Sequence, residues 1–397
     1  MFGLGWLAVQ LAVADGLPER APLYIGLIGL SRAAPALTMS AVAGAVVDRT
    51  DRRRVMLLTQ AVSALFTASL AALTIAGLVT IWIVMLLTVV IGFSASFDAP
   101  ARQSMLHRLV PPAEIMNAIG LQSAVVHGTG IIGPALGGLL IVPIGVGGLF
   151  LANALGYVPV MVAVLLMGSM PAVAGAHERG VLRSVLDGLQ YVARDPILRP
   201  VFLVGIVMSL LARPYLNLLP AFVANHLRLG APELSLLLSI TGLGAMLGAL
   251  AVASLAAVAR RGLLYLAAGI GTSALLAVLG LQSELAGTVT VAFALGFSVM
   301  AFMVMSSTIM QTTTPERLLG RVMALHAMLW MGVMPLGQML LGTIATATGV
   351  GPVYVGGAVV TLTVGIGALW RAQRVRDLVA PALERPAARP APASVAE

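Results

Sequence analysis

Long apolar runs, separated by short polar segments, occupy most of this chain. A helix needs about 20 apolar residues to cross the hydrocarbon core of a bilayer, because each residue adds about 1.5 Å. Backbone polar groups in lipid must bond within their own segment, which favours a helix for every run. The sequence therefore predicts an all-α membrane protein. About twelve helices are expected, at residues 1–14, 22–47, 55–78, 79–98, 117–142, 145–170, 198–225, 232–258, 262–281, 286–310, 319–347 and 351–371.

The first run is shorter than the others. Residues 1–14 fall below the roughly 20 residues that a membrane-spanning helix needs. This stretch also lacks the basic segment and the cleavage site that are typical of a signal peptide. We expect a truncated first helix, with the true start of the protein upstream.

The composition supports lipid as part of the solvent. Hydrophobic residues make up 59% of the 397 residues and charged residues only 10%, against about 25% charged residues in soluble domains. The chain has no cysteine, which excludes disulfides, thiolate metal sites and cysteine nucleophiles. All 23 basic residues are arginines, and most fall in short connections between apolar runs, so we do not expect nucleic-acid binding.

The arginines divide unequally between the two sides of the expected helix bundle. If successive connections alternate sides, nineteen arginines lie on one side and only Arg20 and Arg228 on the other. Arg32 and Arg213 lie inside apolar runs. Connections rich in arginine stay in the cytoplasm, so we expect both termini there. This distribution favours a multi-pass protein of the bacterial inner membrane.

One longer connection divides the helices into two sets of six. Residues 171–197 carry an amphipathic pattern that is typical of a helix at the membrane surface. We therefore expect an N-terminal six-helix half at residues 1–170 and a C-terminal six-helix half at residues 198–371. Residues 372–397 are rich in Pro and Ala, and we expect a disordered cytoplasmic tail there.

Short features of the first half recur in the second half at an offset of about 200 residues. Three matches in the same order indicate a duplicated six-helix unit. In secondary transporters built from such repeats, the substrate site lies between the halves, near the middle of the membrane. The matched features are Gly92–Ser94 with Gly296–Ser298, Pro112 and Glu114 with Pro315 and Glu316, and Gly133–Pro134 with Pro335–Gly337.

The connection after the second run carries the most specific motif of the chain. It reads GAVVDRTDRRRV, from Gly44 to Val55, and it resembles the signature of the major facilitator superfamily between that family's second and third helices. The segments Phe97–Gly138 and Arg213–Pro220 resemble the enterobactin-exporter-like branch. The resemblance implies a major facilitator fold of two pseudo-symmetric halves that exports a small organic molecule by alternating access. We expect a monomer.

The resemblance also implies a gate. Gly44 has no Cβ, so neighbouring helices can approach it closely. The Asp48 carboxylate can accept hydrogen bonds from a neighbouring helix N-terminus, and in the family such contacts help to hold the outward-open state. Arg52 or Arg53 can then pair with Asp98; alternatively, the arginine cluster only orients the protein in the membrane. The expected gating residues are Gly44, Asp48, Arg49, Arg52, Arg53 and Asp98.

Ionisable residues inside apolar runs are candidates for the transport pathway, because charge in lipid is costly. Arg32 and Arg213 could hold an anionic or polar group of the substrate; alternatively, they form structural pairs or reach the outer interface. His127 could titrate near neutral pH and couple protons to transport, or it is hydrogen-bonded between helices. Asp15 could also carry a proton, or it lies in a solvated loop.

Uncharged polar residues in the apolar runs either line a cavity or form hydrogen bonds between helices, and the sequence leaves both open. They are Gln10, Gln122, Asn217 and Gln338.

Motifs for other chemistries are missing from the sequence. It has no ATP-binding loop, no GxSxG or HExxH stretch, and no histidine spacing that suits a metal. We therefore expect no enzyme activity, no cofactor and no metal site. Our main hypothesis is a secondary transporter that exports a siderophore, drug or metabolite in exchange for protons, with membrane lipid around it. An importer or a facilitator is the alternative, and a non-transporting membrane protein is the third hypothesis.

Overall fold

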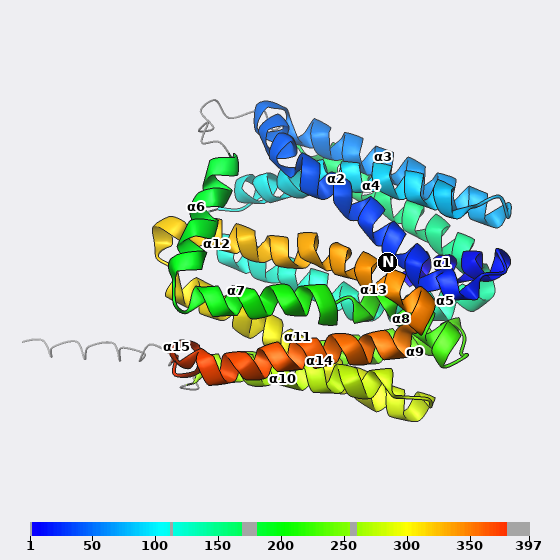
Figure 1. Cartoon of the computed structure of the whole chain (residues 1–397). Coiled ribbons are helices and arrows are strands. Elements are labelled where there is room, and N and C mark those ends of the chain that lie inside the picture. The colour runs from blue at the N-terminus through cyan, green and yellow to red at the C-terminus, as the bar shows by residue number, and fades with distance from the viewer. Residues whose placement is uncertain (1, 112–113, 169–180, 255–259, 379–397) are drawn as a thin grey trace, which may run out of the picture.

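The computed structural model describes residues 2–111, 114–168, 181–254 and 260–378, and every regular element in these ranges is helical. For some residues in the second, fourth and fifth helices the structure describes the backbone but not the side chain. Asp48, Gln122 and His127 are among these residues. The helices run side by side along one direction, and the chain gathers them into two groups (Figure 1).

The first group contains the helices of the N-terminal half. Gly77, with a φ of +69°, ends the turn that separates α3 from α4, and Thr80 caps α4 by accepting from the Ile83 N–H at 3.4 Å. Both features agree with the boundary between the predicted runs. The elements are α1 (Phe2–Ala14), η1 (Pro18–Arg20), α2 (Ala21–Arg49), α3 (Arg52–Ile75), α4 (Ile81–Leu109) and α5 (Ile115–Leu166).

Helix α5 is a single element of 52 residues, but it contains a break. At Gly145 the backbone has a φ of 67° and a ψ of −179°, a conformation that glycine adopts at little cost and other residues rarely adopt. The predicted runs at residues 117–142 and 145–170 therefore lie on either side of one kinked position.

The second group contains the helices of the C-terminal half. Three single turns of π-helix interrupt its long helices, and such turns are frequent at functional sites. One of them ends at Ala212; Arg213 follows, directly before Pro214, which cannot donate a backbone hydrogen bond. The elements are α7 (Leu198–Val207), η3 (Met208–Ala212), α8 (Tyr215–Ala221), η4 (Phe222–His226), α9 (Ala231–Ser254), α10 (Arg261–Gly280), α11 (Leu285–Thr313), α12 (Glu316–Met328), η5 (Leu329–Val333), α13 (Met334–Thr348), α14 (Val350–Arg371) and α15 (Gln373–Arg376).

The connection between the halves contains the amphipathic helix α6 (Val181–Arg194). An ion pair between Asp187 and Arg321, at 3.0 Å, joins α6 to α12. Residues 373–376 of the expected disordered tail instead form α15, which packs on α10 and buries Val375. The rest of that tail, residues 379–397, lies outside the described residues.

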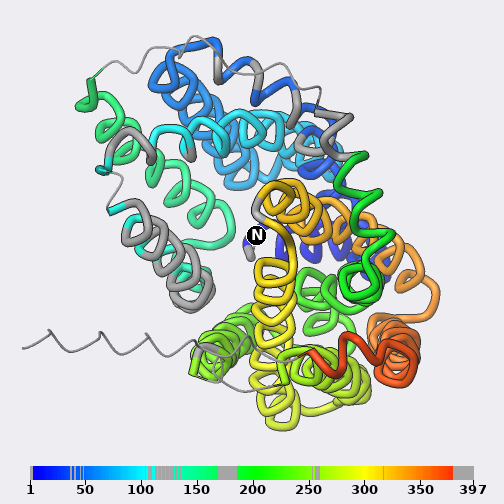
Figure 2. Tube along the Cα trace, turned by 90° about the vertical axis from the view of Figure 1, so that its left-hand side faces the viewer, coloured from blue at the N-terminus to red at the C-terminus, as the bar shows by residue number. Residues whose placement is uncertain are grey.

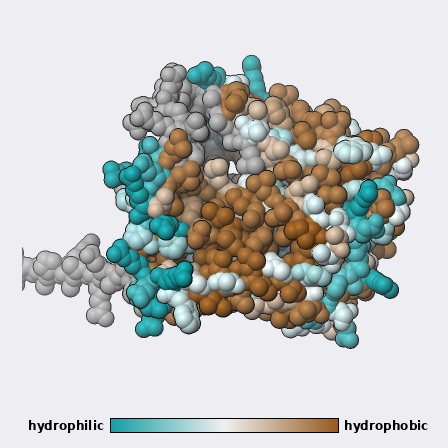
Figure 3. Space-filling view, in the orientation of Figure 1, coloured by the Kyte–Doolittle hydropathy of each residue, from teal (hydrophilic) through white to brown (hydrophobic). Residues whose placement is uncertain are grey.

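The outer surface is suited to lipid. Figure 3 shows a broad hydrophobic belt between two hydrophilic ends. Large apolar side chains within the helices, such as Leu65 and Leu203, are exposed. Nine segments of the described chain are long and apolar enough to cross a membrane. The shorter α1 is not among them, nor are α2 and the first part of α5, where side chains are partly undescribed. The exact count of twelve stays a prediction.

A view along the helices from the end that carries α6 shows the two groups on either side of the centre (Figure 2). We name this end the α6 end. The opposite end, where η1 and the kink of α5 lie, is the α1 end. The signature connection Gly44–Val55 and the C-termini of α5 and α11 belong to the α6 end.

Candidate transport cavity

The two halves contact each other through α2 with α13, α5 with α9, and α1 with α8. Glycine residues allow helices of the two halves to approach each other very closely at these contacts. A Cβ on Gly342 would collide with the Pro22 carbonyl oxygen, and a Cβ on Gly138 would collide with the Ser235 hydroxyl group. Asn225 also donates to the Pro18 carbonyl at 2.8 Å. These contacts close the space between the halves at the α1 end.

A cavity of about 500 Å³ lies behind this closure. Its volume falls in the range of small-molecule sites, about 300–1,000 Å³. Both halves contribute to its wall, which is mostly apolar or glycine. Its polar lining residues are Arg32, Thr129, Asn153, Asn217 and Gln338.

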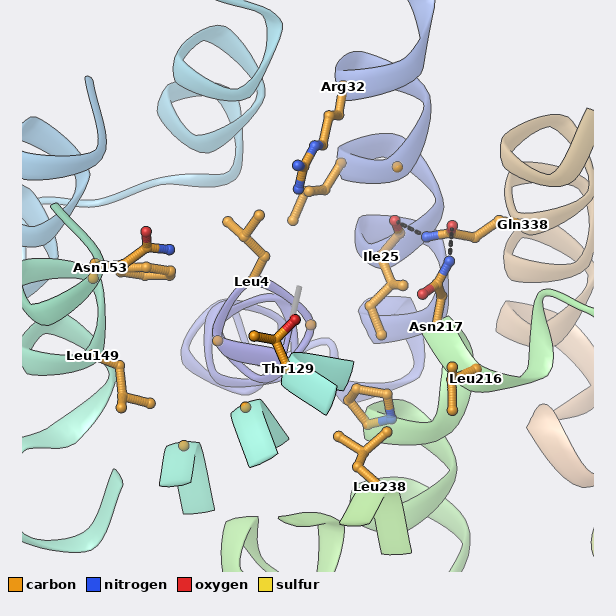
Figure 4. A pocket seen from close by; sticks show the side chains of 18 residues that line it. Leu4, Ile25, Arg32, Thr129, Leu149, Asn153, Leu216, Asn217, Leu238 and Gln338 are labelled. Carbon is orange, nitrogen blue, oxygen red and sulfur yellow. Dashed lines mark hydrogen bonds between the residues drawn. The ribbon is translucent and has the colours of Figure 1, made fainter. Parts of the chain in front are cut away.

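Figure 4 shows how the polar groups are placed in this cavity. Arg32 extends from α2 into the space above Leu4, while Asn153 lies on the opposite side, on α5. Arg32 alone among the lining residues carries a formal charge. Arg32 and Asn153 also line a second cavity of about 530 Å³, which reaches Asp98 and Arg102 within the N-terminal half.

Gln338 connects the halves at the edge of the cavity. Its side-chain N–H donates to the Ile25 carbonyl on α2 at 2.7 Å, and its carbonyl oxygen accepts from Asn217 on α8 at 2.8 Å (Figure 4). A Cβ on Gly29 would lie 2.6 Å from the Gln338 side-chain nitrogen, so only glycine leaves room for this contact. Gln338 is 4% exposed, and both bonds are therefore shielded from water.

Two of the predicted pathway residues, Arg32 and Asn217, line the central cavity. Arg213 does not; it lines a separate small cavity inside the C-terminal half, beside Phe302 and Trp330. Asp15 is exposed directly after α1, where it accepts from the Tyr24 hydroxyl at 2.8 Å. The side chains of Gln122 and His127 lie outside the described part of the chain.

The predicted gate differs in part from the structure. A Cβ on Gly44 would meet no atom of the described chain within 4 Å, so the close approach expected at Gly44 is absent in this conformation. Arg49 is exposed and Arg52 is buried, whereas the Asp48 side chain is outside the described part.

Asp98 and Arg53 have partners that the motif did not indicate. Asp98 forms an ion pair with Arg102, one turn further along α4, and accepts from Gln60 at 2.8 Å. Arg53 donates to the Val164 and Leu165 carbonyls at 3.0 and 2.7 Å, at the C-terminus of α5, where the helix dipole favours a cation. Pairing of Asp98 with Arg52 or Arg53 in another conformation stays a prediction.

Sequence reasoning missed Thr129 and Asn153 as cavity residues, and it missed His326. Asn153 is a lone amide within an apolar run, so the rule that selected Asn217 would have found it. His326 and Trp330 are separated by four residues, the spacing at which side chains on one helix face meet.

Comparisons with known proteins agree with this architecture. The profile of the family described as transmembrane secretion effector, MFS_3, matches residues 3–392. The multidrug efflux pump Tap of Mycolicibacterium fortuitum is 28% identical over 375 residues, which are 90% of this chain and 88% of that protein. The enterobactin exporter EntS of Shigella boydii is 26% identical over 52% of this chain and 50% of its own length.

Two further matches carry less weight: one covers less than half of the matched protein, and the other shows similarity of fold alone. The MFS-type transporter YfiS of Bacillus subtilis is 29% identical, but the match spans only 46% of that protein and 49% of this chain. The crystal structure of a point mutant of the nucleoside transporter NupG has a TM-score of 0.71 at 13% identity and covers 94% of this chain and 95% of NupG. With a profile match along nearly the whole sequence, the chain belongs to the major facilitator superfamily, in its transmembrane secretion effector family.

Proposed function

We propose that this protein exports a small organic molecule across the bacterial inner membrane by alternating access, in exchange for protons. The observation that carries the proposal is the cavity of about 500 Å³ between two halves that contact each other at the α1 end. A site between halves that are closed at one end is the arrangement expected of one state of a rocking transporter.

The arginine distribution supports an orientation for this state. The α6 end carries the signature connection and the arginines at the C-terminus of α14 and in α15. The positive-inside rule assigns an end that is rich in arginine to the cytoplasm. In this orientation the α1 end faces the periplasm, and the conformation is inward-open. Both termini then lie on the cytoplasmic side.

The cavity lining supports a substrate class. Most of the wall is apolar, three amide side chains supply hydrogen-bonding groups, and Arg32 supplies a positive charge. Apolar walls with a few placed polar groups are typical of sites for amphipathic organic molecules. We infer a substrate that combines an apolar body with an anionic or strongly polar group, which Arg32 binds. Asn217 and Gln338 contact it from the C-terminal half.

Export is favoured over import because two relatives of the chain are the multidrug efflux pump Tap and the enterobactin exporter EntS. A direct test is accumulation of carboxyfluorescein, a fluorescent organic anion, in an efflux-deficient bacterium that expresses the chain. The proposal predicts lower steady-state dye content than in a vector control, and Arg32→Gln should restore the dye several-fold. Higher dye content with the wild-type chain would indicate an importer instead.

The signature connection supplies the gate of the opposite state in this proposal. When the halves rock to close the α6 end, Asp48 receives hydrogen bonds from a helix N-terminus of the C-terminal half. The open surroundings of Gly44 are consistent with a gate that is disengaged in the inward-open state.

A further inference from the structure

His326 is a buried histidine that the proposed transport cycle has not yet used. It lies on α12, ten residues after the first residue of that helix, or about 15 Å into the bundle from the α6 end. Its side chain is 8% exposed. This depth places it inside the expected membrane-spanning segment Arg317–Thr348, in the part nearer the α6 end.

The hydrogen bonds of His326 fix its protonation in this conformation. The Trp330 indole N–H donates to Nε2 of His326 at 3.0 Å. An indole nitrogen can only donate, so Nε2 carries no proton here and the imidazole is neutral. The Ser306 hydroxyl lies 3.3 Å from the same nitrogen and is fully buried.

The same contacts define a second arrangement. If a proton binds Nε2, the Trp330 N–H can no longer point at it, and the indole must move. The new N–H has an acceptor ready, because the Ser306 hydroxyl oxygen can accept as well as donate. The site therefore has two alternative hydrogen-bonding patterns that differ by one proton and by the position of one indole.

The surroundings make His326 well suited to bind and release one proton. Along residues 198–371 the only acids are Glu233, Glu284 and Glu316, and each lies at the start of a helix. Arg213 and Trp330 line the same small cavity, so a fixed cation stands near the indole and repels a second positive charge. The other charged or titratable residues of α6, α7, α10 and α12 are Arg183, Asp187, Tyr191, Arg194, Arg199, Arg261, Tyr265, Arg317 and Arg321.

The position of Trp330 connects proton binding to the closure at the α1 end. Trp330 belongs to the π-helical turn η5, and the Ser209 hydroxyl of η3 donates to the carbonyl of the preceding Leu329. Directly after η5 begins α13, which carries Gln338 and holds α2. A change at η5 therefore acts on the helix that joins the halves.

We propose that His326 binds the proton that is exchanged for substrate, and that Trp330 excludes this proton in the inward-open state. The inference rests on the proposed antiport. A proton from the periplasmic side adds to Nε2 in the outward-open state, giving an imidazolium that donates to Ser306. On return to the inward-open state the Trp330 N–H replaces this proton, which passes to water on the cytoplasmic side.

The first arm of the test measures protonation without any substrate. In the full-length chain in lipid nanodiscs, Trp6, Trp82 and Trp370 are replaced by Phe, so that Trp330 alone reports by fluorescence. We expect a sigmoidal change between about pH 5 and 8, the range in which histidine titrates. His326→Gln should abolish this change, and the control His226→Gln, near the end of η4, should keep it. Persistence of the change in His326→Gln would overturn the proposal.

The second arm measures coupling in proteoliposomes with carboxyfluorescein, quantified by extraction into alkaline buffer. An acidic lumen should accelerate uptake by the wild-type chain, and His326→Gln should lower this stimulation to a ratio of about one, because proton and substrate are no longer linked. Exchange of dye for dye at equal pH should persist. Full stimulation in His326→Gln, or loss of exchange as well, would overturn the role.

A second variant addresses Trp330 while keeping its aromatic packing. Trp330→Phe cannot donate to Nε2, so we expect a several-fold loss of pH-driven uptake with exchange retained; unchanged stimulation would contradict the displacement by Trp330. If the wild-type chain itself moves no dye in either assay, the proposed export of organic anions fails. The fluorescence titration then still decides whether His326 takes up the proton.

Discussion

Individual side chains link helices that are far apart in the sequence, and Arg53, which links α3 to the C-terminus of α5, is one example. Its guanidinium group bonds two carbonyls at the end of α5, 111 and 112 residues further along the chain. Sequence reasoning assigned Arg53 to a gate or to membrane orientation, because a carbonyl partner leaves no signal in a sequence. The Asp98–Arg102 pair could have been predicted, since four residues separate the two side chains on one helix.

The contacts of Arg53 lead to a stability prediction. Arg53→Ala should lower the free energy of unfolding by about 1.5–3 kcal/mol, the range for hydrogen bonds to charged groups. The measurement is thermal unfolding of the purified protein in detergent. Arg54→Ala, an exposed neighbour, is the matched control and should unfold like the wild type. Equal behaviour of the two variants would show that the carbonyl contacts contribute little.

Gly29 provides a second prediction at the residue scale. A methyl group in Gly29→Ala would collide with the Gln338 side chain and break its bond to the Ile25 carbonyl. We expect a several-fold loss of dye transport and weaker closure of the α1 end. The control is Gly367→Ala, since a Cβ on Gly367 would meet none of the described atoms within 4 Å. Normal transport by Gly29→Ala would mean that the Gln338 contact is dispensable.

Asp48 tests the gate that the sequence motif implies. Asp48→Asn keeps the size of the side chain but removes the charge that a helix N-terminus stabilises. We expect strongly reduced transport with normal insertion into the membrane, read from dye efflux and from the amount of protein in the membrane fraction. Unaltered efflux by this variant would refute the gating role of Asp48.

At the scale of elements, the kink in α5 depends on one glycine. Gly145 has a positive φ with an extended ψ, a conformation that costs a residue with a Cβ about 1–3 kcal/mol. Gly145→Ala should therefore lower the thermal stability, whereas Gly156→Ala, in the same helix and in open space, should not. Similar melting temperatures for both variants would contradict the need for glycine at the kink.

Most element boundaries were accessible from the sequence, and the reasons are local. Apolar runs with glycine between them gave the boundary between α3 and α4 and the two parts of α5, because lipid leaves the backbone no alternative to a helix. The predicted run at residues 79–98 ended too early, because α4 continues through the polar residues after it to Leu109. The π-helical turns η3, η4 and η5 were not foreseen. The hydrogen bonds of a π-helical turn span one residue more than those of an α-helix. Contacts from other helices, such as Ser209 with Leu329, accommodate this extra residue, and no local sequence pattern indicates it. The ordered α15 was missed because Val375 is buried by α10.

At the scale of the whole molecule, the duplication and the charge distribution predicted two halves with a site between them. The structure places the cavity there, but only part of the lining could be named beforehand. Arg32 and Asn217 stood out because they interrupt apolar runs. Thr129 and Leu149 do not, and their place on the wall depends on how α5 packs against the opposite half.

The proposed transport cycle depends on alternating closure of the two ends. The chain has no native cysteine, so spin labels can be attached to introduced cysteine pairs without further changes. Leu78 and Leu281, both exposed, lie in the two halves at the α1 end, and the exposed Leu166 and Gln311 lie in the two halves at the α6 end.

Double electron–electron resonance on these two pairs in nanodiscs gives the decisive measurement. On acidification, which we expect to favour the outward-open state, the Leu166–Gln311 distance should shorten while the Leu78–Leu281 distance lengthens. Addition of carboxyfluorescein at neutral pH should redistribute the same two populations. Distances that change in the same direction at both ends, or at neither end, would contradict alternating access in this protein.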